Sequence, residues 1–135
     1  MRSAPHLDRQ ELAAIFAGGF LGTIARAALA QSLAVRPDQW PWATFAVNIL
    51  AALVLGVVIT RYQERLPSRT PGRAFLGTGF CGALSTFSTM MLELLRMIDG
   101  AHWVLALGYT GASVACGLGA VLLSSRLTRR RCVSA

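Results

Sequence analysis

Lysine is absent from this sequence, and charged residues of every kind are scarce, making up 14% of its 135 residues. Thirteen arginines against six acidic residues leave a formal net charge of +7. A soluble nucleic-acid-binding domain would spread such a charge over one folded face and place aromatic side chains between the cations. Here the arginines cluster at the ends of apolar runs instead. We therefore expect no nucleic-acid partner.

Cysteine motifs are missing as well. The three cysteines, Cys81, Cys116 and Cys132, are an odd number, have no C-x-x-C spacing and have no histidine neighbours. This pattern supports neither a zinc site nor a disulfide framework. No set of residues suggests covalent chemistry, so we expect a protein that is not an enzyme.

Long apolar runs dominate what is present. They cover residues 12–33, 42–60, 74–98 and 102–124, and 54% of the chain is hydrophobic. At about 1.5 Å per helical residue, each run can cross a hydrocarbon layer about 30 Å thick. A soluble protein of this size could not bury four such segments. The sequence predicts an all-α membrane protein, with four transmembrane helices in a single membrane domain over residues 1–135.

The arginines predict an orientation for these helices. Ten of them fall on one side of a four-helix topology, against Arg36 and Arg96 on the other. The ten are Arg2, Arg9, Arg61, Arg65, Arg69, Arg73, Arg126, Arg129, Arg130 and Arg131. Because arginines near membrane spans favour the cytoplasm, both termini are predicted to be cytoplasmic if the orientation is fixed. We expect a multi-pass protein of the plasma (inner) membrane.

The first run could also be read as a signal peptide, since Ala28, Leu29 and Ala30 resemble a cleavage site. Arg26 interrupts the segment that a signal peptide keeps uncharged. We therefore expect this run to stay as a helix.

A central arginine such as Arg26 is costly in a bilayer and should face protein or a wet vestibule. We hypothesise that Arg26 and Glu93 lie at similar depth and interact directly or through water. The alternative is that each reaches the interface separately.

Polar side chains interrupt the second and fourth runs. Thr44 and Asn48 are four residues apart, as are Tyr109 and Ser113, so each pair shares a helix face. A lone hydroxyl can bond the carbonyl four residues back in its own helix. An asparagine amide needs partners that its own helix does not supply. Polar groups at this depth are costly and therefore mark candidate functional sites.

The third run has a polar centre. Gly77-Thr78-Gly79-Phe80-Cys81-Gly82 is followed closely by Ser85-Thr86-Phe87-Ser88-Thr89. Each glycine weakens a helix by about 1 kcal/mol relative to alanine, so we predict a break in this helix. Carbonyls freed at membrane depth must find protein, water or a cation. The start of the following half-helix attracts an anion. The segment therefore predicts an ion site.

Small residues at spacings of four, such as Gly18 and Gly22 or Ala52 and Gly56, predict close packing between helices. Four slim helices leave little room for a water-filled path between them. We therefore expect a transport function to require at least a dimer.

Taken in order, these motifs resemble the Fluc (CrcB-type) fluoride channels. The matching segments are Gly18–Gly22 followed by Arg26, Pro41–Asn48, Gly79–Thr89 and Tyr109–Ser113. The resemblance implies a fluoride-specific ion channel that passively exports fluoride and so lowers its cytoplasmic concentration and toxicity. It implies an antiparallel, dual-topology type of dimer. It also implies a structural sodium ion on the backbone carbonyls of Gly82 and Ser85.

The same resemblance implies a fluoride path. It includes Asn48, Phe87, Met90, Tyr109 and Ser113, with the hydroxyls of Thr86, Ser88 and Thr89 nearby. Fluoride holds its water strongly, so a pore must replace that water with donors. Amide and hydroxyl groups and the Arg26 guanidinium can donate, and a phenylalanine presents a positive ring edge.

Two positions depart from the family pattern: Met90 stands where a second phenylalanine is typical, and Gly117 where a serine is frequent. Together with the arginine bias, they raise an alternative in which this chain is one subunit of a heteromeric fluoride channel. Its own pore would then be impaired and its partner would be a paralogous subunit of opposite orientation. A small multidrug-type exporter is less well supported, because Glu11 precedes the first run. A non-transporting scaffold would not account for Asn48 or the break.

Overall fold

The computed structural model describes residues 8–32, 36, 38–65 and 70–133, so the predictions for Arg2 and Arg69 lie outside the described residues. Two long helices, α1 (Arg9–Ser32) and α2 (Trp42–Arg65), come first. The third span consists of α3 (Pro71–Arg73), η1 (Ala74–Cys81), α4 (Gly82–Leu84) and α5 (Phe87–Asp99). The last helix, α6, runs over Trp103–Val133. The predicted all-α architecture is confirmed.

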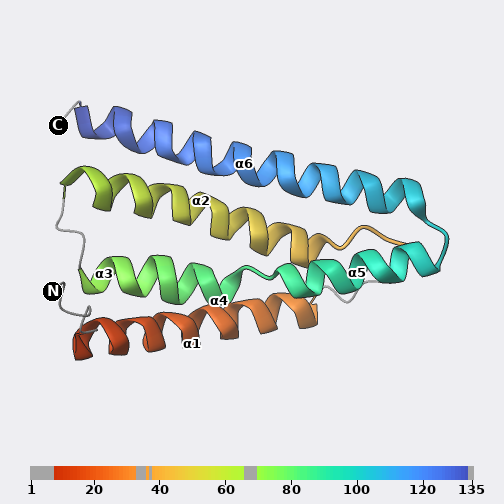
Figure 1. The fold of residues 1–135 in the computed structure, drawn as a ribbon, viewed down its shortest axis with the longest axis horizontal. Helices are drawn as coiled ribbons and strands as arrows, with labels where there is room; N and C mark the ends of the chain where they lie inside the picture. The colour runs from red at the N-terminus through yellow and green to blue at the C-terminus, as the bar shows by residue number, and fades with distance from the viewer. Residues whose placement is uncertain (1–7, 33–35, 37, 66–69, 134–135) are drawn as a thin grey trace, which may run out of the picture.

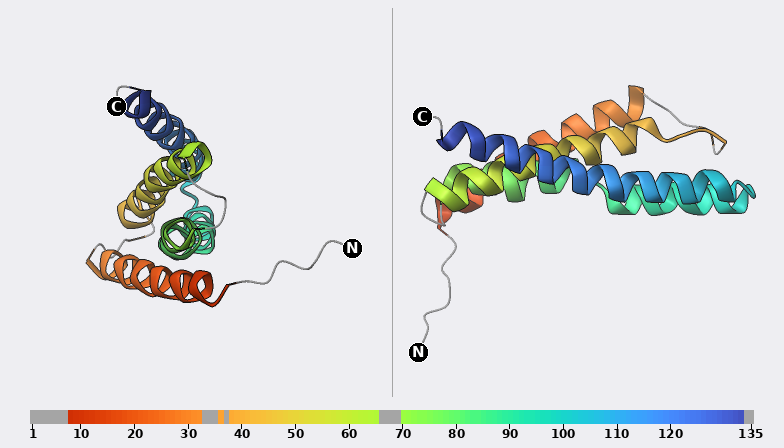
Figure 2. Two further views of the ribbon diagram at one scale, coloured as in Figure 1. Left: turned by 90° about the vertical axis from the view of Figure 1, so that its left-hand side faces the viewer. Right: turned by 90° about the horizontal axis from the view of Figure 1, so that it is seen from above.

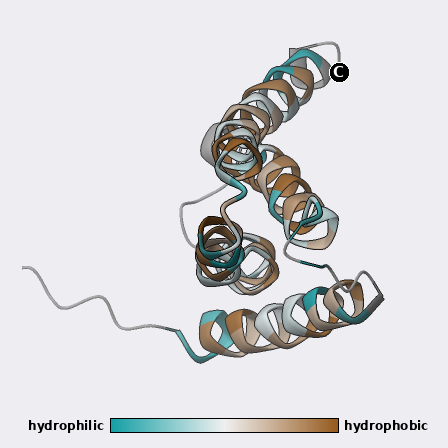
Figure 3. Cartoon of the chain, turned by 90° about the vertical axis from the view of Figure 1, so that its right-hand side faces the viewer, coloured by the Kyte–Doolittle hydropathy of each residue, from teal (hydrophilic) through white to brown (hydrophobic). Residues whose placement is uncertain are grey.

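Four stretches of the described chain are long and apolar enough to cross a membrane. They are Arg9–Gln31, Trp42–Tyr62, Pro71–Asp99 and Trp103–Arg130. Most turns of these helices carry hydrophobic residues (Figure 3). Helix α6 is longer than predicted, with 31 residues. At about 46 Å it exceeds the hydrocarbon thickness, so its arginine-rich end extends beyond the apolar layer.

The third span lies in the middle of the molecule, between α1 and α2 (Figures 1 and 2). Helix α1 packs on η1 and α4, whereas α2 packs on α6. Helix α1 begins at the same end of the bundle at which α2 and α6 end (Figure 1). The α5–α6 turn and the start of α2 lie at the opposite end. Because the chain crosses the bundle four times, the described arginines of the predicted cytoplasmic side lie at one end of the bundle.

The third span is broken at Ser85 and Thr86, as predicted. Both residues have extended backbones, with φ −70° and ψ 148° at Ser85 and φ −144° and ψ 111° at Thr86. The break follows the glycines rather than falling among them. Gly77 and Gly79 belong to the π-helical segment η1. A Cβ on Gly79 would lie 2.6 Å from the Ile15 carbonyl oxygen of α1. That glycine is therefore required for close helix packing.

The turn between α5 and α6 contains a non-glycine residue with positive φ, Ala101, at 59°. Around it, the Gly100 N–H donates to the Arg96 carbonyl at 3.1 Å and the His102 N–H to the Met97 carbonyl at 2.8 Å. A Cβ in the left-handed region costs about 1 kcal/mol or more. The turn is therefore held by its hydrogen bonds against a local penalty.

We expect Ala101→Gly to stabilise the protein by up to about 1 kcal/mol, because glycine is favoured at a left-handed helix end. The measurement is the midpoint of thermal unfolding in detergent. Ala112→Gly, inside α6, is the matched control and should destabilise by about 1 kcal/mol. A lower midpoint for Ala101→Gly than for the unmodified protein would contradict the prediction.

Candidate functional site

Asn48 of α2 bridges the break in the third span. The Thr86 N–H donates to Asn48 Oδ1 at 2.8 Å, and Asn48 Nδ2 donates to the Thr86 carbonyl at 3.3 Å. Both backbone groups of Thr86 are thus satisfied by one side chain, as buried backbone groups in a membrane must be. The predicted need of Asn48 for a partner outside its own helix is met here. One of its two amide hydrogens remains for another acceptor.

Hydroxyl groups gather at the start of α5. Thr86 caps this helix, because the Thr89 N–H donates to Thr86 Oγ1 at 3.2 Å. The Thr86 hydroxyl donates to Thr89 Oγ1 at 2.8 Å, and Ser88 Oγ lies 3.4 Å from Thr86 Oγ1. The positive end of the α5 dipole points at the same place. Three of the predicted site residues therefore form one polar cluster.

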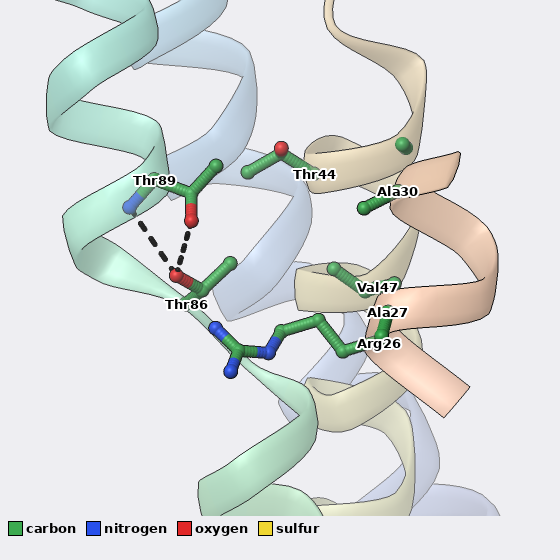
Figure 4. Close-up of a pocket in the computed structure, with 8 residues that line it drawn as sticks. Arg26, Ala27, Ala30, Thr44, Val47, Thr86 and Thr89 are labelled. Carbon is green, nitrogen blue, oxygen red and sulfur yellow. Dashed lines mark hydrogen bonds between the residues drawn. The ribbon is translucent and has the colours of Figure 1, made fainter. Parts of the chain in front are cut away.

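A cavity of about 140 Å³ separates this cluster from α1. Its lining comprises Arg26, Ala27, Ala30, Ala43, Thr44, Val47, Thr86 and Thr89. The Arg26 side chain extends from α1 toward Thr86 (Figure 4). One guanidinium and three hydroxyl-bearing side chains line the cavity together with small apolar residues, and no acidic side chain is among them. This lining suits a small anion.

Glu93 of α5 is held by two donors that the sequence analysis did not assign to it. The Thr44 hydroxyl donates to Glu93 Oε1 at 2.6 Å, and the Tyr109 hydroxyl donates to Oε2 at 2.9 Å. Between the described residues Arg26 and Glu93 there is no ion pair, so the direct form of the predicted interaction is wrong. They remain linked through Thr44, which lines the Arg26 cavity. Contact through water stays a prediction.

Phe87 and Met90 point in different directions. The Phe87 side chain is 73% exposed, whereas Met90 is buried and packs with Met97, Ala106 and Tyr109. Met90 therefore belongs to the interior between α5 and α6. Phe87 belongs to the outer surface at the break, beside the exposed Ser88.

A groove of about 420 Å³ lies between α2, α6 and the third span at its break. It is lined by Asn48, Ala51, Ala52, Leu55, Gly77, Cys81, Gly82, Ser85, Gly117, Leu118 and Val121. Gly82 and Ser85 are exposed in it. The groove brings Asn48 close to both of them and to Gly117, one of the two departures from the family pattern.

The backbone at the break leaves carbonyl oxygens without their usual helical donors. In a continuous helix the Thr86 N–H would donate to the Gly82 carbonyl, but here it donates to Asn48. Likewise the Thr89 N–H, which would bond the Ser85 carbonyl, donates to the Thr86 side chain. The predicted pair of carbonyls is therefore available at this surface.

Comparison with known proteins gives consistent matches over nearly the whole chain. The family model described as "CrcB-like protein, Camphor Resistance (CrcB)" matches residues 13–125. A "Fluoride-specific ion channel FluC 1" of Mycolicibacterium paratuberculosis is 55% identical over 123 residues, which is 91% of this chain and 93% of that protein. The protein of the same name from Mycobacterium bovis is 50% identical over 126 residues, 93% of this chain and 96% of its own. A "Fluoride-specific ion channel FluC 2" of Symbiobacterium thermophilum is 38% identical over 120 residues, 88% of this chain and 98% of its own.

Proposed function

Because this chain belongs to the CrcB-like family, and its relatives are named fluoride-specific ion channels, we propose that it is a fluoride channel of the cell membrane. It lets fluoride leave the cell passively and so lowers the cytoplasmic concentration of the ion. The structural observation that carries the proposal is the cavity between Arg26 and the start of α5. Its lining has a cation and hydroxyls but no acid. A cation would find no carboxylate in this lining to balance its charge.

The path must replace the water of a strongly hydrated ion with hydrogen-bond donors. The Arg26 guanidinium, the second amide hydrogen of Asn48 and the hydroxyls at the start of α5 are donors at the break. Ser113 adds a buried hydroxyl that has no partner in the described chain. The exposed ring of Phe87 can present its positive edge to an anion.

The carbonyls of Gly82 and Ser85 fit the sodium ion that the family resemblance implies. They are neutral oxygens freed from helical bonding at membrane depth, as unwound backbone carbonyls that coordinate sodium are. Both residues are exposed, so a second chain can reach them. A bound sodium ion would supply a fixed positive charge between two chains. One chain offers two such carbonyls, so a complete site requires a second chain.

A second chain would also cover the exposed Phe87. An aromatic side chain that is 73% exposed, two residues after Ser85, is ready to pack on a partner. We propose an antiparallel dimer, in which the surface at the break of one chain meets that of the other. The partner is either a second copy or a paralogous subunit.

The arginine distribution is the observation that supports the alternative partner, a paralogous subunit. Ten arginines against two indicate a fixed orientation with both termini cytoplasmic. Arg36, on the sparse side, also forms an ion pair with Asp38, with Nε and Oδ1 3.5 Å apart. An antiparallel homodimer would expose one strongly basic end on the outer side of the membrane. A subunit of opposite bias would avoid that cost.

Purified protein in liposomes tests both forms of the proposal. Vesicles loaded with potassium fluoride should release fluoride to an electrode only after valinomycin is added, because passive anion flow needs a compensating potassium current. Release by the singly expressed protein supports a homodimer. Release only after coexpression with a paralogue of opposite arginine bias supports the heteromer. Absence of fluoride release in both preparations would overturn the proposal.

A further inference from the structure

Two hydrogen-bond donors without partners belong to residues next to Tyr109. Among the described residues, the buried side-chain polar atoms that lack a partner are Trp40 Nε1, Thr70 Oγ1 and Ser113 Oγ. Ser113 lies one turn along α6 from Tyr109. The Trp40 ring lies 5.5 Å from the Tyr109 ring between centroids, with an interplanar angle of 83°. Thr70 precedes α3 at the opposite end of the bundle.

The unpaired indole N–H of Trp40 is costly. A buried donor left unsatisfied carries the full penalty of losing its water, and a phenylalanine would fill most of the same space without that penalty. The ring is held in place by edge packing on Phe45, with centroids 5.6 Å apart. Neighbouring Trp42 differs, because 61% of it is exposed and its N–H can reach water or lipid headgroups. The environment of Trp40 therefore calls for an acceptor.

The nearby hydroxyls are already engaged. Those of Tyr109 and Thr44 both donate to Glu93. The N–H of Trp40 and the hydroxyl of Ser113 have no such partner. They can therefore donate to an anion at this end of the molecule without breaking an existing hydrogen bond. Both belong to side chains at Tyr109, which is itself completely buried.

We propose that Trp40 is a fluoride-binding residue that extends the ion path beyond Tyr109, toward the end of the bundle where α2 begins. The ion first accepts a hydrogen bond from the hydroxyl of Ser113 and then one from the indole N–H of Trp40. Tyr109 lies between these two ion positions. The inference rests on the proposed fluoride conduction. It adds a residue outside the four helices to the path, since Trp40 precedes α2.

The first test compares Trp40→Phe with Trp42→Phe in the liposome efflux assay. Trp40→Phe keeps an aromatic ring on Tyr109 and Phe45 but removes the donor. Because a hydrogen bond to a charged group is stronger than one between neutral groups, we expect the apparent fluoride affinity to weaken about ten- to a hundredfold. Trp42→Phe should leave the affinity unchanged. Equal affinities of Trp40→Phe and the unmodified channel would overturn the inference while the proposed function stands.

The second test needs no variant channel for its main readout. The chain has three tryptophans, Trp40, Trp42 and Trp103, so ¹⁵N-indole labelling gives three side-chain signals, assigned with single Trp→Phe variants. Sodium fluoride should shift the Trp40 signal saturably, whereas sodium chloride at the same ionic strength should not. A Trp40 signal that does not move, or that moves no more than the other two, would overturn the inference. If liposomes containing the unmodified protein released no fluoride, that result would instead count against the proposed function.

Discussion

Asn48→Leu is expected to reduce fluoride efflux to the background of protein-free liposomes. Leucine has the same number of side-chain heavy atoms, branched at the same carbon, but offers no donor or acceptor. The Thr86 N–H and carbonyl would then both lose the partner that lies 2.8 and 3.3 Å away. Each buried group left unsatisfied costs about 1–3 kcal/mol. The break would therefore rearrange, and the path would lose both its shape and an amide donor.

The effect must be separated from a general loss of stability. Thr110→Val is the matched control, because it removes a hydroxyl that bonds the Ala106 carbonyl of its own helix at 2.8 Å. It should retain near-normal efflux. Both variants are to be compared by size-exclusion profile before reconstitution. If Asn48→Leu retained more than about half of the efflux, its two bonds to Thr86 would contribute less than about 1 kcal/mol to the conducting state, which contradicts the prediction.

Local signals explain why so much of this fold could be predicted. The length and apolarity of a run determine whether it can cross the membrane, and neither depends on the rest of the chain. The same holds for the polar cluster after Gly82, because hydroxyls and glycines destabilise a helix wherever it lies. Asn48 could be singled out for a related reason: its amide cannot be satisfied within one helix. Its actual partner, Thr86, could not be identified from these signals.

The partners of Arg26 and Glu93 could not be predicted, because they depend on how each helix is rotated about its own axis. Arg26 and Glu93 were paired on depth alone, but depth does not determine which way a side chain points. Glu93 points to Thr44, which is 49 residues away in the chain, and to Tyr109. The spacing of Thr44 and Asn48 was the available signal, since it placed both on one face of α2. That face meets the third span at its break, through Thr86, and beyond the break in α5, through Glu93.

Gly18→Ala is expected to disrupt the packing of α1 on the third span. A Cβ at this position would overlap the Phe75 carbonyl oxygen and would lie 3.0 Å from the Phe80 nitrogen. These are backbone atoms of η1 and cannot move aside as a flexible side chain can. Overpacking of this kind typically costs about 1–3 kcal/mol. Because Arg26 is carried by the same helix, the cavity that it shares with Thr86 should change as well.

The neighbouring Gly19 provides the control within the same turn of helix. Its nearest atom to an added Cβ is the Gly79 carbonyl oxygen at 3.9 Å, an ordinary contact distance. Gly19→Ala should therefore unfold at or above the temperature of the unmodified protein, since alanine favours a helix over glycine by about 1 kcal/mol. Gly18→Ala should unfold several degrees lower in detergent and release fluoride more slowly from liposomes. Equal unfolding temperatures for the two variants would show that α1 is not packed on η1 through Gly18, and the position of Arg26 beside the break would then have no structural basis.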